Sequence, residues 1–112
     1  MEGQKLTGID DSVERIVDYI KGSPEYVDFK NKRSVVASNP ELKAKADRIR
    51  MENFELQQVT DESRLMDELD QFMERNEQDY AIVEIHDYIE AENVFCRLMQ
   101  TIIDRVMGEL DF

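Results

Sequence analysis

The sequence predicts an all-α fold, a helical bundle of about five helices with a long C-terminal helix. Three observations predict it. Apolar residues recur every three or four positions through most of the chain, capping residues interrupt that pattern, and no segment alternates apolar and polar residues as a strand does. Residues 1–8 are expected to form a flexible lead-in, and residues 9–112 a single helical domain.

The first two helices are separated by a glycine, a serine and a proline. Acidic and hydroxyl side chains at residues 10–12 can cap a helix start, and apolar residues at helical spacing then predict a short helix that ends at Gly22. Ser23 caps the next helix, and Pro24 is tolerated at its first position because the missing amide hydrogen would be unpaired. This second helix should run for about 14 residues, with an inner face of Tyr26, Val27, Phe29, Lys30, Val35 and Val36.

Helix-capping residues occur at two further positions. Asn39 and Pro40 begin a third helix that should reach about Gln58, and the residues that share its inner face are Leu42, Ala46, Ile49, Asn53 and Leu56. Asp61 or Thr60 caps a fourth helix, which fades over residues 75–79 and whose apolar positions are Leu65, Leu69, Phe72 and Met73.

The last helix begins near Asp79 and organises the rest of the chain. A stripe of apolar residues runs along it at steps of three, four or seven, namely Ile82, Ile85, Ile89, Cys96, Met99, Ile103, Val106 and Leu110. A second apolar set joins it after Val94, so the helix must be covered on more than one side, by the rest of the chain, by a second copy or by both. We therefore expect a dimer whose interface comprises Ile85, Ile89, Glu92, Phe95, Met99, Ile102, Ile103 and Val106.

Two polar residues interrupt this apolar part of the last helix. Glu92 stands where the spacing calls for an apolar residue, and Gln100 lies further along. Each either makes a polar contact that fixes a partner or register, or lies at the solvent edge of the stripe.

The charge balance favours a protein partner. The formal net charge is -12, with 26 acidic and 14 basic residues, and the densest basic group is Lys43, Lys45, Arg48 and Arg50. Since nucleic-acid affinity depends on neutralising phosphates, direct nucleic-acid binding is not expected. The exposed acids of the fourth helix are the candidate partner surface: Asp67, Glu68, Asp70 and Glu74.

The expected compartment is the cytoplasm. No stretch of 18 apolar residues and no signal peptide occurs, so neither membrane insertion nor secretion is expected. Cys96 is the single cysteine, and its place in the apolar stripe predicts a buried, slowly reacting thiol.

No motif predicts an enzyme or a cofactor. A glycine-rich phosphate loop, a Cys-x-x-Cys pair and a nucleophile elbow are all missing, and the acidic clusters lack the loop spacing and glycine of a calcium site. The alternative to a protein that acts by binding another protein is a small-ligand or metal-binding bundle that uses His86, Glu90 and Glu92, although a structural zinc normally needs four ligands.

Four segments, in their order and spacing, are typical of one group of proteins. They are Ser23-Pro24-Glu25-Tyr26, Asn39-Pro40-Glu41-Leu42, residues 50–57 (RMENFELQ) and residues 91–100 (AENVFCRLMQ). With the short first helix, they resemble the YlbF/YmcA/YheA family of small bacterial helical proteins over about residues 9–112.

The resemblance implies an all-helical, non-catalytic protein that forms dimers or larger homo-oligomers. Better-studied relatives are regulatory adaptors that assemble with another protein, modulate ribonuclease Y-dependent messenger RNA maturation and influence competence, sporulation and biofilm formation. Those relatives carry tail cysteines associated with an iron-sulfur cluster. Here the one cysteine lies inside the last helix, so the chain is more similar to the short members without that tail, and the cluster is not expected.

Overall fold

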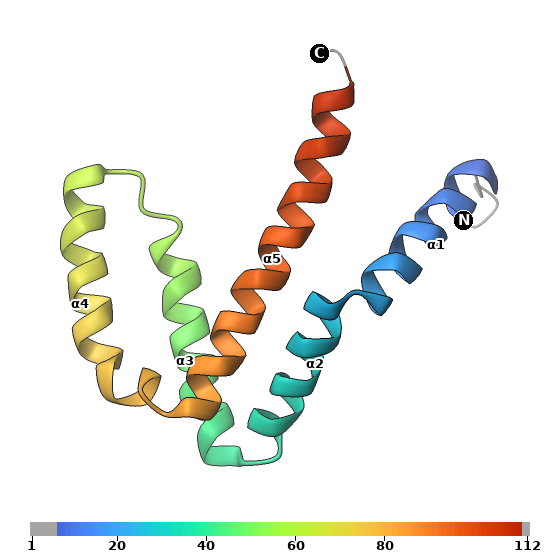
Figure 1. Ribbon diagram of the computed structural model, residues 1–112. Helices are drawn as coiled ribbons and strands as arrows, with labels where there is room; N and C mark the ends of the chain where they lie inside the picture. Colours follow the sequence, from blue (N-terminus) through green and yellow to red (C-terminus); the bar gives the residue numbers. More distant parts are fainter. Residues whose placement is uncertain (1–6, 111–112) are drawn as a thin grey trace.

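The computed structural model describes residues 7–110, which form five helices and no strand. In chain order they are α1 (Thr7–Gly22), α2 (Pro24–Ala37), α3 (Pro40–Leu56), α4 (Glu62–Tyr80) and α5 (Val83–Glu109) (Figure 1). The predicted all-α fold with a long C-terminal helix is thereby confirmed.

Side-chain caps begin three of the helices where the sequence places them. The Ser23 hydroxyl accepts from the Tyr26 amide at 3.2 Å, the Asn39 side chain from the amides of Glu41 and Leu42, and the Asp61 carboxylate from the Ser63 amide at 3.0 Å. These bonds satisfy amide groups that have no partner within the helix. Because a proline follows two of the caps, the starts of α2 and α3 were readable from sequence.

Two predicted boundaries are wrong. Residues 1–6 of the predicted lead-in lie outside the described residues, but Thr7 and Gly8 already belong to α1, and the Ser12 hydroxyl donates to the Gly8 carbonyl within that helix. The last helix begins at Val83 rather than near Asp79, because α4 does not fade but continues to Tyr80. The turn at residues 81–82 contains neither glycine nor proline to mark it.

The core lies where α2 and α3 pack against the first half of α5 (Figure 1). Its buried apolar residues come from these three helices: Phe29, Val36, Ala46, Ile49, Ile85, Tyr88, Ile89 and Ala91. The Phe29 ring stacks between Tyr88 and Phe95, with ring centroids 5.9 Å and 5.4 Å apart. These contacts bind the start of α2 to the middle of α5.

The predicted inner face of α2 is too wide. Phe29 and Val36 are buried and Tyr26 is half-buried, but Val27, Lys30 and Val35 are exposed. The buried pair lies seven residues apart on one side of the helix, and this side alone packs on α3 and α5. The predicted face of α3 is confirmed at Ala46 and Ile49, which are buried.

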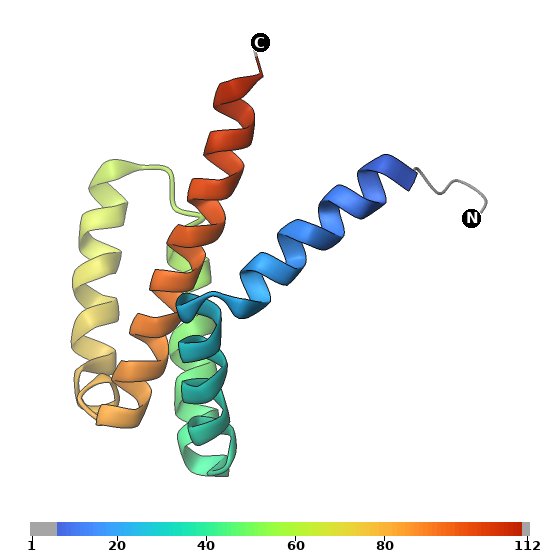
Figure 2. The same ribbon diagram turned by 45° about the vertical axis from the view of Figure 1, so that its right-hand side comes forward.

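The chain has an extended shape. Its radius of gyration is 17.9 Å, whereas a compact domain of this length has about 13 Å. Figure 2 shows the reason, because α1 and the C-terminal half of α5 project away from the body in different directions. Within the described residues α1 packs only against α2.

Candidate interaction surfaces

An ion pair joins the middle of α3 to the middle of α5. The Arg50 Nε donates to both carboxylate oxygens of Glu92, at 2.9 and 3.0 Å, and its Nη2 donates to one of them at 2.6 Å. The guanidinium also lies over the Tyr88 ring, 5.6 Å from its centroid. The hydrogen bond to Glu92 raises the pKa of Arg50 above its usual value, so the guanidinium is charged at any physiological pH.

This pair decides the role of Glu92. Its polar contact is made within the chain and joins α3 to α5 where the core ends, so it agrees with the interpretation of a polar contact that fixes register, here between two helices of one chain. For Gln100 the solvent-edge interpretation holds: the side chain is exposed and donates to Asp104 at 2.7 Å.

A polar network joins α3 to α4. Buried Asn76 donates from Nδ2 to the Glu52 carboxylate and to the Phe72 carbonyl, both at 2.9 Å, and Arg75 donates to Glu52 at 3.0 Å. These donors lower the pKa of Glu52, with the bond from Asn76 the largest cause. Sequence reasoning missed this network because Asn76 lies in the polar run that was read as the fading end of the helix.

A groove of about 510 Å³ runs between α3, α4 and α5. Apolar and polar side chains line it, and the polar ones include Arg50, Asn76 and Glu92. The apolar residues that line it are Ile49, Leu69, Phe72, Met73, Ala81 and Ile89. Two of these polar residues also link its helices, since Glu92 joins α5 to α3 through Arg50 and Asn76 joins α4 to α3 through Glu52.

The predicted metal-binding set does not come together. His86 pairs with Asp87 at 3.2 Å, Glu90 accepts from the Tyr80 hydroxyl, and Glu92 is held by Arg50. Residues 86 and 90 share one side of α5, whereas residue 92 lies on the opposite side, at 100° per residue. Within residues 7–110 no three His, Cys, Asp or Glu side chains are grouped to hold a metal ion.

The residues predicted for a dimer interface divide into three groups. Ile85 and Ile89 are buried in the chain's own core and Glu92 is ion-paired to Arg50, so these three make contacts within the chain. Phe95, Met99 and Ile102 are half-buried. Ile103 and Val106 are each 50% exposed, with Met107 and Leu110 beside them. The C-terminal half of α5 thus presents an uncovered apolar face.

Cys96 is exposed, so the prediction of a core thiol is wrong for the single chain. Residue 96 lies on the side of α5 that faces the core at Ile85 and Ile89, but further along the helix. Partial burial, and then the nearby Glu92 charge, raise the pKa of this thiol.

The densest basic group is neutralised within the chain. Lys43 pairs with Asp47 at 2.7 Å, Lys45 and Arg48 both pair with Asp79, and Arg50 pairs with Glu92. A strand of nucleic acid would have to displace these carboxylates. Each ion pair gained with a phosphate would then replace an ion pair lost within the chain, with little net gain in free energy.

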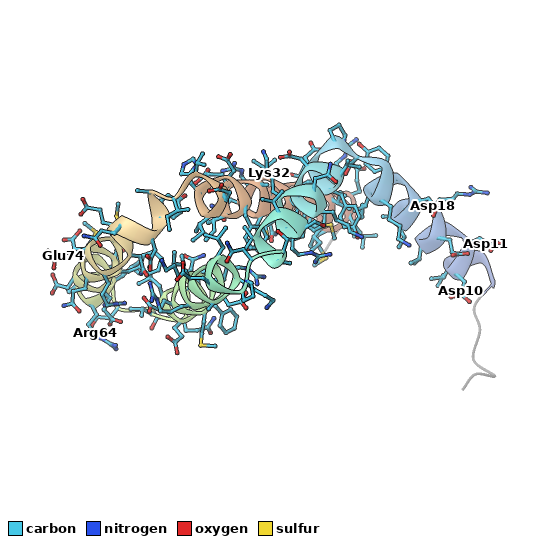
Figure 3. All side chains as sticks on the ribbon, turned by 90° about the horizontal axis from the view of Figure 1, so that it is seen from below. Asp10, Asp11, Asp18, Lys32, Arg64 and Glu74 are labelled. Atoms are coloured by element: carbon cyan, nitrogen blue, oxygen red, sulfur yellow. The ribbon has the colours of Figure 1, made fainter. Side chains whose placement is uncertain are left out.

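The acidic residues of α4 are not equivalent. Glu68 pairs with Arg64 at 2.8 Å, whereas Asp67, Asp70 and Glu74 are exposed on the outer side of the helix. Figure 3 shows Glu74 and Arg64 at the end of the molecule opposite α1. The free acidic surface of α4 is therefore narrower than predicted.

The described helices include none that is long and apolar enough to cross a membrane.

A comparison with known families gives a match over nearly the whole chain. The family model described as "Control of competence regulator ComK, YlbF/YmcA" matches residues 9–111, nearly the whole chain. Neither the curated proteins nor the solved structures compared with the chain include a match.

The Arg50–Glu92 pair should contribute measurably to stability. In a double-mutant cycle with Arg50→Ala and Glu92→Ala at one protein concentration, we expect a coupling free energy of about 1 kcal/mol, since the pair is multiply hydrogen-bonded but only half-buried. The exposed Arg64–Glu68 pair is the matched control and should give about 0.3 kcal/mol. Urea unfolding measures both, and equal couplings would contradict the role assigned to Glu92.

Proposed function

The chain belongs to the YlbF/YmcA family, and from this premise we propose that it is a non-enzymatic, homo-oligomeric regulatory adaptor that binds another protein. The family is described by its control of a competence regulator, which supports a regulatory role. Control of RNA processing, competence, sporulation or biofilm formation is proposed by resemblance, with the cytoplasm as the compartment.

The uncovered apolar face of α5 is the observation that carries the proposal. Met99, Ile102, Ile103, Val106 and Leu110 continue the face that is buried in the core at Ile85, yet no part of residues 7–110 covers them fully. Apolar faces of this extent mark protein contact sites on soluble domains. A second copy is the partner that is present at the same concentration and carries the same face.

The surface chemistry supports a protein target. The basic side of α3 is occupied by the chain's own carboxylates, whereas Asp67, Asp70 and Glu74 are exposed and form no ion pair within residues 7–110. Free acids of one sign speed the encounter with a basic protein surface. An effect on a nuclease or a transcription regulator would then be exerted through contacts between proteins.

The apolar groove between α3, α4 and α5 favours a second candidate function, the binding of a small apolar molecule. Its volume of about 510 Å³ lies within the range of ligand pockets. A thermal-shift screen separates the two functions, because a ligand of the folded state raises the melting temperature by mass action.

Ile103→Asp should convert the assembled protein to a monomer. The new carboxylate would lie unpaired in the contact between copies, which costs several kcal/mol, while the chain's own core is not touched because Ile103 is half exposed. Light scattering measures the mass. Arg97→Glu, on the polar side of α5, should leave it unchanged. Wild-type protein that is monomeric at micromolar concentration would end the proposal of self-association.

Cys96 should report the same contact. The thiol is exposed in one chain but lies on the apolar side of α5, so a second copy packed there would shield it. We expect slow labelling by a thiol reagent in the wild type and faster labelling in Ile103→Asp. The labelling rate of the unfolded protein gives the upper limit for a fully accessible thiol. Identical rates in the two folded proteins would show that Cys96 is not part of the contact.

The purified protein should not bind RNA. Non-specific affinity requires free positive groups, and those of the α3 basic side are paired with Asp47, Asp79 and Glu92. A gel-shift assay with single-stranded RNA at low micromolar protein and physiological salt should show no complex. If a complex forms, and Arg48→Ala with Lys43→Ala removes it, the α3 side is an RNA site and the adaptor proposal fails.

A further inference from the structure

Helix α1 has an apolar stripe that the rest of residues 7–110 leaves mostly exposed. Ile9, Val13, Ile16 and Ile20 follow one another at steps of four, three and four, with Val17 alongside. Ile9 is 59% exposed and Val13 50% exposed. The other sides of α1 are mainly charged, and Figure 3 shows Asp10, Asp11 and Asp18 along it. Such a helix stabilises itself by burying the stripe against another one.

The C-terminal half of α5 has a stripe of the same length and spacing. Met99, Ile103, Val106 and Leu110 also follow at steps of four, three and four, so both stripes extend over twelve positions, from 9 to 20 and from 99 to 110. Alternating steps of three and four are the seam of a coiled coil, in which each side chain inserts between four residues of the facing helix. The two stripes can therefore mesh along their whole length.

Within one chain the stripes do not meet. In both ribbon views α1 and the end of α5 diverge (Figures 1 and 2), and among the five helices α1 packs against α2 alone. The corner between α1 and α2 is held at Ser23, which is buried and whose hydroxyl donates to the Ile20 carbonyl at 2.6 Å while accepting from the Tyr26 amide. Folding α1 back onto its own α5 would break this corner.

The chain exposes more surface than a compact domain of its length, and this excess indicates how much area a second copy would cover. The chain exposes 8670 Å², whereas a compact monomer of this length exposes about 6,400 Å². The excess, roughly 2,000 Å² for each copy, is in the range of large obligate dimer interfaces. A two-fold axis closes both contacts at once, since each copy supplies one α1 and one α5.

We propose that the α1 stripe of one copy packs on the α5 stripe of a second copy, and the reverse. This exchange rests on the self-association proposed above and goes further, because it assigns α1 to the contact and pairs it with α5 rather than with another α1.

The test uses two double variants of the full chain. Val13→Glu with Ile16→Glu disables the α1 stripe, and Ile103→Glu with Val106→Glu disables the α5 stripe. Arg15→Glu and Arg97→Glu are the matched controls, because each changes the charge by the same amount on the polar side of the same helix. The four substituted stripe residues are all exposed, so circular dichroism should show retained helix content.

Each double variant alone should scatter light as a monomer, while the wild type and both controls scatter as dimers. In an equimolar mixture, the intact α1 of one variant faces the intact α5 of the other, so one contact of the two is restored. An affinity-tagged α1 variant should therefore capture the untagged α5 variant, but not an untagged copy of itself.

Three results would overturn the exchange. If the α1 variant stays a dimer while the α5 variant dissociates, self-association through α5 stands and α1 plays no part. If each variant captures an untagged copy of itself but not the other variant, like stripes pair with like. A monomeric wild type would remove the exchange and the proposed self-association together.

Discussion

The structure depends on an apolar face of α5 that is longer than the chain can cover. It begins at Ile85 in the core and continues on the same side to Leu110, but α2 and α3 reach only its first half. Hydrophobic burial scales with area removed from water, so the covered half folds the chain and the uncovered half remains available for association. This mismatch, between the length of the apolar face and the helices that cover it, accounts for the extended shape and the exposed Cys96.

The Arg50–Glu92 pair lies where the covered part of that face ends. An apolar residue at position 92 would extend the stripe without interruption and would leave the register between α3 and α5 to packing alone. The pair instead fixes one register through hydrogen bonds with set geometry. On the other side of α3, Glu52 and Asn76 do the same for α4. Helix α3 is thus held by directional polar contacts on both sides, and the groove lies between them.

Sequence reasoning succeeded where a local rule decides the structure. Ser23-Pro24, Asn39-Pro40 and Asp61 cap helices through bonds within four residues, so their positions could be read directly. It failed where a distant contact decides. The turn before Val83 has no breaking residue, Val27 and Val35 are exposed because α2 packs on one side only, and the partner of Glu92 lies 42 residues away. Burial of Ile85 and exposure of Ile103 cannot be told apart by periodicity, since both belong to one stripe.

The same mismatch links folding to assembly. A domain of this size has a thin core even when compact, and here α1 and the last turns of α5 gain little from it. A partner that binds only the folded chain stabilises it in proportion to the logarithm of its concentration. The helices that a second copy covers should then be the ones whose order depends on protein concentration, while α2, α3 and the first half of α5 stay folded through the core and its ion pair. Regulation through such a protein can act on the amount of the chain as well as on its target.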